Sequence, residues 1–141
     1  MSISQAVILV YFNPKNKDEV LCVSRKDDHN SYGLPGGKIE SEETYLSALV
    51  RELEEEINIS VNPHKCSFVF QDICTGSDTI TYITDDVLEI PTTPFINDEG
   101  AMVSFQPIAK LINENDSLFY EYNLKLFKSL NNDLDYIQYQ K

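Results

Sequence analysis

The feature that most constrains this chain is a pair of glycines followed by an amphipathic helical pattern that ends in acidic residues. Residues 34–59 read LPGGKIESEETYLSALVRELEEEINI. The apolar residues in this segment recur at helical spacing and form one stripe that must face a core. They are Leu46, Leu49, Val50, Leu53 and Ile57. We expect Ser41 to cap this helix, with Glu42 and Glu43 in its first turn.

The acidic end of this helix needs a physical reason. Carboxylates there face the partial negative charge of unpaired carbonyls, and each costs roughly a few tenths of a kcal/mol. A rotation of about 100° per residue places Glu52, Glu55 and Glu56, here called the flank acids, on one flank and Glu54 on the other. Such a cluster of hard oxygen ligands suits Mg²⁺ or Mn²⁺. The alternative is a solvated acidic face, but the preceding glycines favour a ligand site because they allow close backbone approach.

Composition limits the class of protein. The 141 residues include 23 acids and 11 bases, and the net charge of −12 disfavours binding to a nucleic-acid polymer. A small phosphorylated substrate that arrives with a divalent cation remains compatible. The three cysteines form no CxxC pair, so we expect free thiols in a reducing, cytoplasmic location. We expect one domain over residues 1–141, with no leader and no membrane-spanning run.

The rest of the chain interleaves apolar runs with turn-forming segments. Residues 6–12 and 20–26 are strand-like runs separated by NPKNKDE, which predicts that they pair as a hairpin. The other expected elements are strands at 67–74, 79–87 and 101–108, a loop at 89–100, and a second amphipathic helix from about residue 116. The apolar stripe of this helix is predicted at Leu118, Tyr122, Leu126 and Leu130 or their neighbours. This order predicts an α/β (α+β) fold with helices packed on a mixed β-sheet.

From Gly37 the sequence reads G-x5-E-x7-R-E-L-x-E-E-x-N-I, which resembles the Nudix box G-x5-E-x7-R-E-U-x-E-E-x-G-U, where U is a bulky aliphatic residue. Eight defined positions match over 23 residues: Gly37, Glu43, Arg51, Glu52, Leu53, Glu55, Glu56 and Ile59. Asn58 replaces the last glycine, and asparagine is the residue next most able to adopt the left-handed conformation that ends a helix. The resemblance implies the Nudix α/β/α sandwich.

The resemblance also implies a metal-dependent hydrolase. The flank acids match the family's catalytic, metal-binding carboxylates, and Glu52 is also the candidate for activating water. Mg²⁺, for which Mn²⁺ can substitute, would bridge diphosphate oxygens and lower the pKa of the attacking water. The Gly36 carbonyl is an expected further ligand. In several relatives a late acid completes the metal shell, and here Glu99 is favoured over Asp98.

Basic and aromatic residues near the box are the candidates for orientation and substrate binding. Arg51 can pair with Glu55 or Glu43 and hold the loop and helix in register. Arg25 and Lys38 flank the glycine turn and are the expected phosphate contacts, with ordinary surface bases as the alternative. Tyr32 stands where relatives commonly have tryptophan, and we expect it to contact the substrate.

The chain lacks the additional motifs of the ADP-ribose, NADH and coenzyme A types of Nudix enzyme. It therefore most resembles MutT-like pyrophosphohydrolases, which cleave a nucleoside triphosphate to the monophosphate and pyrophosphate; oxidised dGTP is one candidate substrate. The alternatives are a hydrolase of dinucleoside polyphosphates or nucleotide sugars, and a non-catalytic nucleotide-binding module. The expected partner is a small nucleotide bound by a monomer or homodimer, with no nucleic-acid polymer and no membrane.

Overall fold

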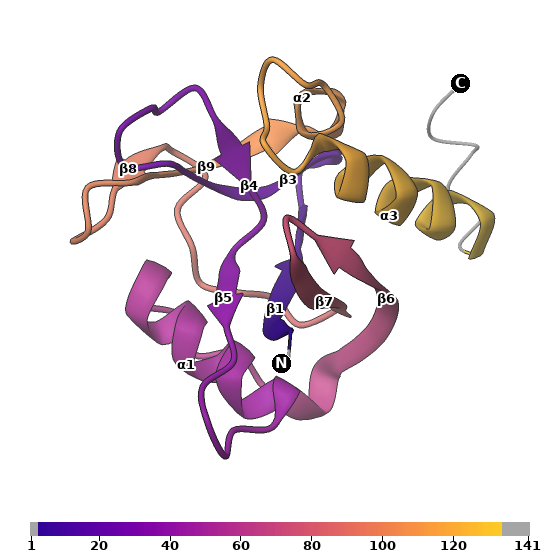
Figure 1. Ribbon diagram of the computed structural model, residues 1–141. Helices are drawn as coiled ribbons and strands as arrows, with labels where there is room; N and C mark the ends of the chain where they lie inside the picture. Colours follow the sequence, from indigo (N-terminus) through magenta and orange to yellow (C-terminus); the bar gives the residue numbers. More distant parts are fainter. Residues whose placement is uncertain (1–2, 134–141) are drawn as a thin grey trace.

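The computed structural model describes residues 3–133, which form two sheets covered by helices (Figure 1). The first sheet has the order β5 (Gly36–Lys38), β1 (Ser4–Val10), β7 (Ser77–Thr84) and β6 (Cys66–Cys74). The second has the order β2 (Phe12–Asn13), β3 (Asn16–Ser24), β9 (Met102–Pro107) and β8 (Phe95–Ile96), with β4 (Tyr32–Gly33) paired to β3. The helices are α1 (Tyr45–Ile57), α2 (Ile108–Leu111) and α3 (Tyr120–Asp133), and η1 (Pro63–Lys65) is a short 3-10 helix. Within the described residues, none of them has the length and apolarity that a membrane span requires.

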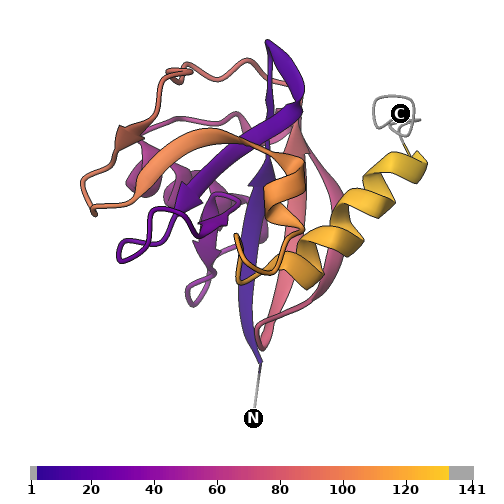
Figure 2. The same cartoon turned by 90° about the horizontal axis from the view of Figure 1, so that it is seen from above.

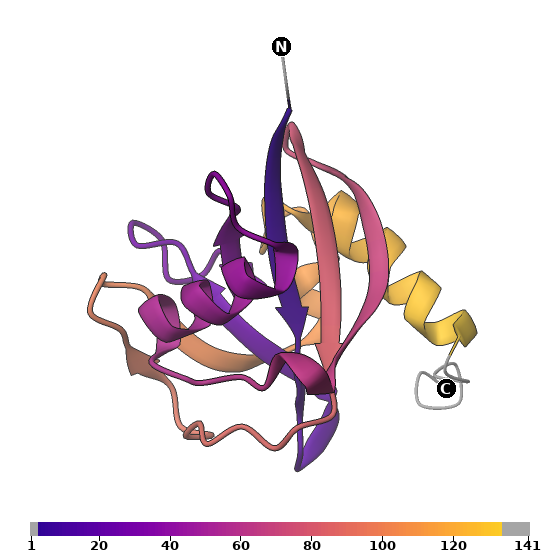
Figure 3. The ribbon, with the colours of Figure 1, turned by 90° about the horizontal axis from the view of Figure 1, so that it is seen from below.

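The first sheet is mixed, as the sequence predicted. Its strand β1 runs parallel to β7 and antiparallel to β5, so the glycine turn is attached directly to a central strand. On the far side of β7, β6 continues the sheet in the antiparallel sense. The helices α1 and α3 lie on opposite sides of these strands (Figure 2 and Figure 3). The expected α/β/α layering is therefore confirmed.

Two hydrophobic cores lie on the two sides of β1, because successive side chains of a strand point to opposite faces. Val7 and Leu9 pack in the core that contains Leu49 and Leu53 of α1. Val10 packs instead in the core formed with α2 and α3. Leu49 and Leu53 are fully buried, so truncating either to alanine would cost about 2–5 kcal/mol. The apolar stripe of α1 thus anchors its acidic flank to the sheet.

The predicted hairpin between residues 6–12 and 20–26 is wrong, because β1 and β3 belong to different sheets. The hairpin that forms is β2 with β3, where Asn13 lies opposite Asn16. The Asn13 side chain accepts the N–H of Lys15 at 3.0 Å, which closes a tight turn. Such a turn pairs only the residues beside it, while the chain before Tyr11 continues into the first sheet. The strands predicted at 67–74, 79–87 and 101–108 form as β6, β7 and β9.

Helix α1 begins later than predicted, since Thr44 and not Ser41 caps it. The Thr44 side chain accepts the N–H of Ser47 at 3.1 Å, and the Ser47 hydroxyl accepts the N–H of Thr44 at 2.9 Å. This reciprocal capping satisfies two backbone donors at once. Glu42 has a φ of 70°, which is incompatible with a helix. The prediction that Glu42 and Glu43 lie in the first turn of the helix is therefore wrong.

Helix α3 also starts later than the predicted residue 116, at Tyr120. Tyr122, Leu126 and Leu130 are buried and form the apolar stripe that the spacing predicted. The prediction that Leu118 belongs to this stripe is wrong, because Leu118 precedes the helix and is 57% exposed. The short helix α2 gave no periodic signal in the sequence because it is a single turn.

Candidate active site

The glycine pair allows β5 to lie directly against α1 and β1. Gly36 has a φ of +143°, and a Cβ there would overlap the backbone oxygen of Val7. A Cβ at Gly37 would overlap the carboxylate of Glu52. Gly36 therefore requires the absence of a side chain, whereas a side chain at Gly37 would require the Glu52 carboxylate to move. The second glycine leaves the space that the Glu52 carboxylate occupies.

The flank acids differ in how they are held. The Glu52 side chain is 19% exposed and faces Gly37. Glu56 is partly buried, and its Oε1 accepts the N–H of Gly36 at 3.0 Å. The Glu55 side chain is 59% exposed at the rim. Glu54 is exposed and turns away, with its carboxylate 3.5 Å from the Ser60 hydroxyl.

Arg51 connects the helix to the loop before it. Its guanidinium donates to both carboxylate oxygens of Glu43, at 2.7 and 2.9 Å. Nη1 donates to Glu52 at 3.0 Å and to Glu55 at 3.3 Å. Nη2 also donates to the carbonyl of Lys38 at 3.1 Å. Arg51 thus pairs with both of the acids that the sequence offered as alternatives, and it orients Glu52 as well.

Electrostatics at the end of α1 oppose the ionisation of Glu52 and Glu56. Burial raises the pKa of Glu56 to about 7, with further contributions from the charges of Glu52 and Glu99, while the hydrogen bond from Gly36 opposes the rise. Burial also raises the pKa of Glu52, and its bond with Arg51 works in the opposite direction. Carboxylates that raise one another's pKa in this way gain from a bound cation.

These residues fit a divalent ion that shares its shell with substrate, rather than a cage made by protein alone. Within residues 3–133, no three acidic, histidine or cysteine side chains form a group that could hold a metal ion by themselves. Mg²⁺ usually takes one or two carboxylates and completes its shell with water and phosphate oxygens. Glu52 and Glu56, beside the backbone of Gly36, provide such a partial set.

Of the two late acids, Glu99 is the one whose charge acts on Glu52 and Glu56. It lies in the turn between β8 and β9, and its charge contributes to the raised pKa of both Glu52 and Glu56. Its side chain is 51% exposed and lies 3.7 Å from the ammonium of Lys26. The turn thus brings a residue distant in sequence to the end of α1.

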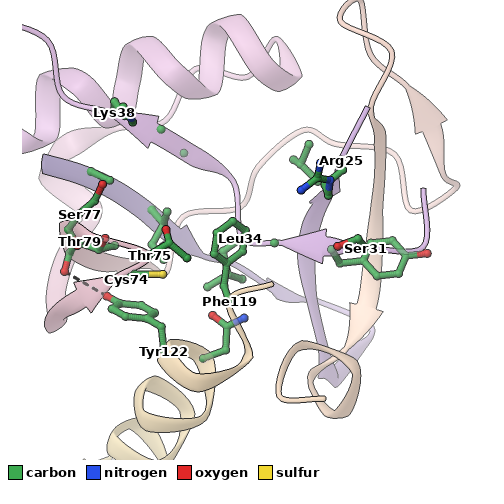
Figure 4. A pocket seen from close by; sticks show the side chains of 18 of the residues that line it. Arg25, Ser31, Leu34, Lys38, Cys74, Thr75, Ser77, Thr79, Phe119 and Tyr122 are labelled. Carbon is green, nitrogen blue, oxygen red and sulfur yellow. Dashed lines mark hydrogen bonds between the residues drawn. The ribbon is translucent and has the colours of Figure 1, made fainter. Parts of the chain in front are cut away.

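A cleft of about 400 Å³ opens beside the flank acids, a volume that suits a small organic ligand. The charged and glycine-rich part of its lining consists of Arg25, Gly36, Gly37, Lys38 and Glu56. The apolar part of its lining includes Ile8, Leu34, Cys74, Phe119 and Tyr122. Figure 4 shows Leu34 beside Phe119 near the centre of the view, with Lys38 and Arg25 above them on opposite sides and Tyr122 below. One cleft therefore joins a charged region to an apolar one.

The three predicted substrate contacts all line this cleft, but they are not equally available. Tyr32 is buried in the wall, with the Lys110 ammonium 5.7 Å from its ring centre. Lys38 is exposed. Arg25 already makes two hydrogen bonds to Asp27, at 2.9 and 3.0 Å. A phosphate group at Arg25 would have to share the guanidinium with that carboxylate.

Sequence reasoning missed Asn123, a polar residue of the cleft. It is 1% exposed, and its Nδ2 donates to the carbonyl of Leu111 at 3.0 Å. In the part of the chain that the structure describes, no donor forms a hydrogen bond with its Oδ1. A buried amide with a free acceptor can select a ligand that carries an N–H group. The only signal in the sequence is an asparagine on the apolar side of a helical pattern.

Comparison with known proteins agrees with this geometry. A family model described as the NUDIX domain matches residues 3–126. No curated protein sequence matches the chain. Among solved structures, a MutT from a study of the Aliivibrio salmonicida and Vibrio cholerae proteins is 23% identical, with a TM-score of 0.62 over 86% of this chain and 97% of that one.

Two further structures extend the likeness. The E. coli ORF135 protein is 20% identical, with a TM-score of 0.65 over 93% of this chain and 92% of that one. A structure described as an ADP compounds hydrolase is 18% identical, with a TM-score of 0.66 over 95% of this chain and 74% of that one. At these identities the structures show a shared fold. Because the family model spans most of its length, the chain belongs to the NUDIX domain family and is a hydrolase of phosphoric anhydrides.

Proposed function

We propose that this protein is a MutT-like, Mg²⁺-dependent pyrophosphohydrolase that cleaves a nucleoside triphosphate to the monophosphate and pyrophosphate. The observation that carries the proposal is the composition of one cleft. Its glycine turn and Glu56 belong to the Nudix box, and the same cleft continues into the apolar surface around Leu34 and Phe119. A triphosphate and a base are the two chemically different ends of one ligand that such a cleft would accept.

The residues of the box divide the chemistry among them. When bound, a divalent ion supplies charge neutralisation and a lowered pKa for the attacking water. Glu52 and Glu56 would hold it with the Gly36 carbonyl, and Glu99 would complete the set. Arg51 keeps Glu52 ionised and oriented, so that Glu52 can accept the proton of the water. Glu55, at the exposed rim, would reach the ion through water.

The opposite end of the cleft would bind the nucleoside. The side chains of Leu34 and Phe119 offer apolar contact to a base. The Oδ1 of Asn123 offers an acceptor to an N–H group on the edge of that base. Lys38 and Arg25 would contact the phosphates between the two ends. A volume of about 400 Å³ suits a small ligand such as one nucleotide.

A nucleotide panel tests the proposal. The panel comprises the common and oxidised nucleoside triphosphates, ADP-ribose, a nucleotide sugar and a diadenosine polyphosphate, each incubated with Mg²⁺ and with EDTA. We expect Mg²⁺-dependent turnover of a triphosphate with release of pyrophosphate, and none with EDTA or with a Glu56→Gln protein. Release of orthophosphate alone, or turnover confined to the other substrates, would contradict the proposal. Binding of a nucleotide without any turnover would indicate a sensor module.

A further inference from the structure

The turn that carries Glu99 is organised around one side chain, that of Asn97. Its Oδ1 accepts the N–H of Glu99 at 3.0 Å and the N–H of Ala101 at 2.9 Å. Its backbone N–H donates to the carbonyl of Ala101 at 2.8 Å, and its carbonyl accepts from Gly100 at 3.0 Å. Its Nδ2 donates to the carbonyl of Glu56 at 2.9 Å. A single amide thus contacts both the turn and helix α1.

The contact with α1 satisfies a group that the helix cannot satisfy itself. The Glu56 carbonyl lies in the last turn of α1, where carbonyls have no intrahelical partner. Asn58 ends the helix in a left-handed conformation, and its N–H reaches the carbonyls of Glu54 and Leu53 instead. The Asn97 amide supplies the donor for Glu56 from a segment 41 residues away. The position of the Asn97 side chain is therefore tied to the end of α1, where Glu56 lies.

The other side of the turn is held by the loop between β3 and β4. The Nε2 of His29 lies 2.9 Å from the Gly100 carbonyl, and the ammonium of Lys26 lies 3.7 Å from Glu99. Both contacts are at exposed positions, where an ion pair contributes roughly 0–1 kcal/mol. Asn97, by contrast, is partly buried. Its side chain makes three hydrogen bonds, to Glu56, Glu99 and Ala101, and its backbone N–H makes a fourth, to Ala101. The Asn97 side chain therefore links the turn to the end of α1.

We propose that Asn97 is a positioning residue of the active site, whose carboxamide holds the turn of Glu99 against the end of α1, so that Glu99 can join Glu52 and Glu56 around a cation whose shell is completed by water and substrate oxygens. The inference rests on the proposed metal-binding role of these acids. Substitution of residues that orient metal ligands in this way typically lowers metal affinity or activity by about 10–100-fold. Asn97 would act on the metal through the position of Glu99, without contact of its own.

Titration of the purified protein with Mn²⁺, followed by the EPR signal of the free ion, tests this role. We expect Asn97→Ala to weaken Mn²⁺ binding about tenfold. In a Glu99→Gln background the same substitution should cause little further loss, because its effect passes through Glu99. The control is Asn62→Ala, which removes a comparable bond to the N–H of His64 at an exposed site after α1. It should leave Mn²⁺ affinity unchanged.

A second variant separates the hydrogen bonds that Asn97 makes within the turn from the one that it donates to the Glu56 carbonyl. In Asn97→Ser the hydroxyl can still accept an N–H within the turn, but it is too short to reach the Glu56 carbonyl. We expect this variant to fold and to bind Mn²⁺ more weakly than the wild type. Wild-type affinity in Asn97→Ala or Asn97→Ser, or fully additive losses with Glu99→Gln, would overturn the inference. Unchanged Mn²⁺ binding in Glu56→Gln would instead overturn the proposed metal site.

Discussion

The backbone N–H of Gly36 donates a 3.0 Å hydrogen bond to the carboxylate of Glu56, which joins the glycine turn to the acidic end of α1. This bond favours the ionised form of Glu56. Burial and the charges of Glu52 and Glu99 outweigh it, so the pKa of Glu56 rises to about 7. Near neutral pH, ionising this acid therefore destabilises the folded protein when no cation compensates.

The first prediction concerns stability against pH in the presence of EDTA. The Glu56 carboxyl has an ordinary pKa of 4.5 when the chain is unfolded and about 7 when it is folded. The unfolded chain loses this proton first, so the free energy of unfolding should fall as the pH rises from 4.5 to 7. The loss is at most about 3 kcal/mol. Urea unfolding should show this decrease in the wild type and a smaller one in Glu56→Gln. Identical pH profiles would contradict it.

A second prediction follows from the space that Gly37 leaves for Glu52. In Gly37→Ala the new Cβ would overlap the Glu52 carboxylate, which would have to move and weaken its bond with Arg51, so we expect a loss of about 0.5–1.5 kcal/mol in stability. Displacing that carboxylate by about 1 Å should lower turnover about 100-fold. In a Glu52→Ala background the glycine substitution should cost much less stability, because the overlapping atoms are gone. Equal costs in the two backgrounds, measured by urea unfolding, would disprove the steric explanation.

The third prediction concerns Arg51→Lys. Lysine keeps the charge but cannot bond Glu43 and Glu52 together, so we expect turnover to fall about 10–100-fold. The hydrogen bond from Arg51 lowers the pKa of Glu43 to about 2. The stabilisation by this carboxylate is complete above its ordinary pKa of 4.5 and is lost as the pH falls through about 2.

Acid unfolding, followed by circular dichroism, should therefore begin at a higher pH in Arg51→Lys than in the wild type. Arg25→Lys is the matched control, since Arg25 also bonds a carboxylate bidentately but at an exposed position. Its acid transition should move little. If both variants unfolded at the same pH, the hydrogen bonds of Arg51 to Glu43 and Glu52 would have no special role in stability.

The sequence predicted those features that depend on local spacing. The buried face of α1 follows directly from its periodicity, and the left-handed conformation of Asn58 follows from its place where the family has glycine. Strand pairing was less accessible. Strand β1 pairs with β7, about 70 residues away, and nothing in the local sequence distinguishes that partner from the nearer β3. The cap of α1 was misplaced because Ser41 and Thr44 are both good capping residues.

The candidate site divides in the same way. The acids of the box lie within one helix, so their relative positions could be derived from helical geometry. The contributions of Asn97 and Asn123 could not, because each depends on where a distant segment lies against α1 or the cleft. The ion pair between Arg25 and Asp27 also escaped prediction. Its two residues are close in sequence, but only the loop conformation brings them together.

The last prediction addresses why a helix should end in so many acids. If the flank acids gather to bind metal, Glu56→Gln should abolish most turnover, yet in EDTA it should be as stable as the wild type or more stable, because one poorly solvated charge is removed. Mg²⁺ should raise the melting temperature of the wild type more than that of the variant, since an ion that binds the folded state stabilises it. Glu54→Gln is the matched control, because Glu54 faces Ser60 on the opposite flank and its loss should leave turnover and the Mg²⁺ effect intact. Thermal melts with and without Mg²⁺, beside turnover of a nucleoside triphosphate, make the comparison. Equal losses at the two positions, or a Glu56→Gln protein that unfolds without metal, would mean that the acidic run serves folding rather than catalysis.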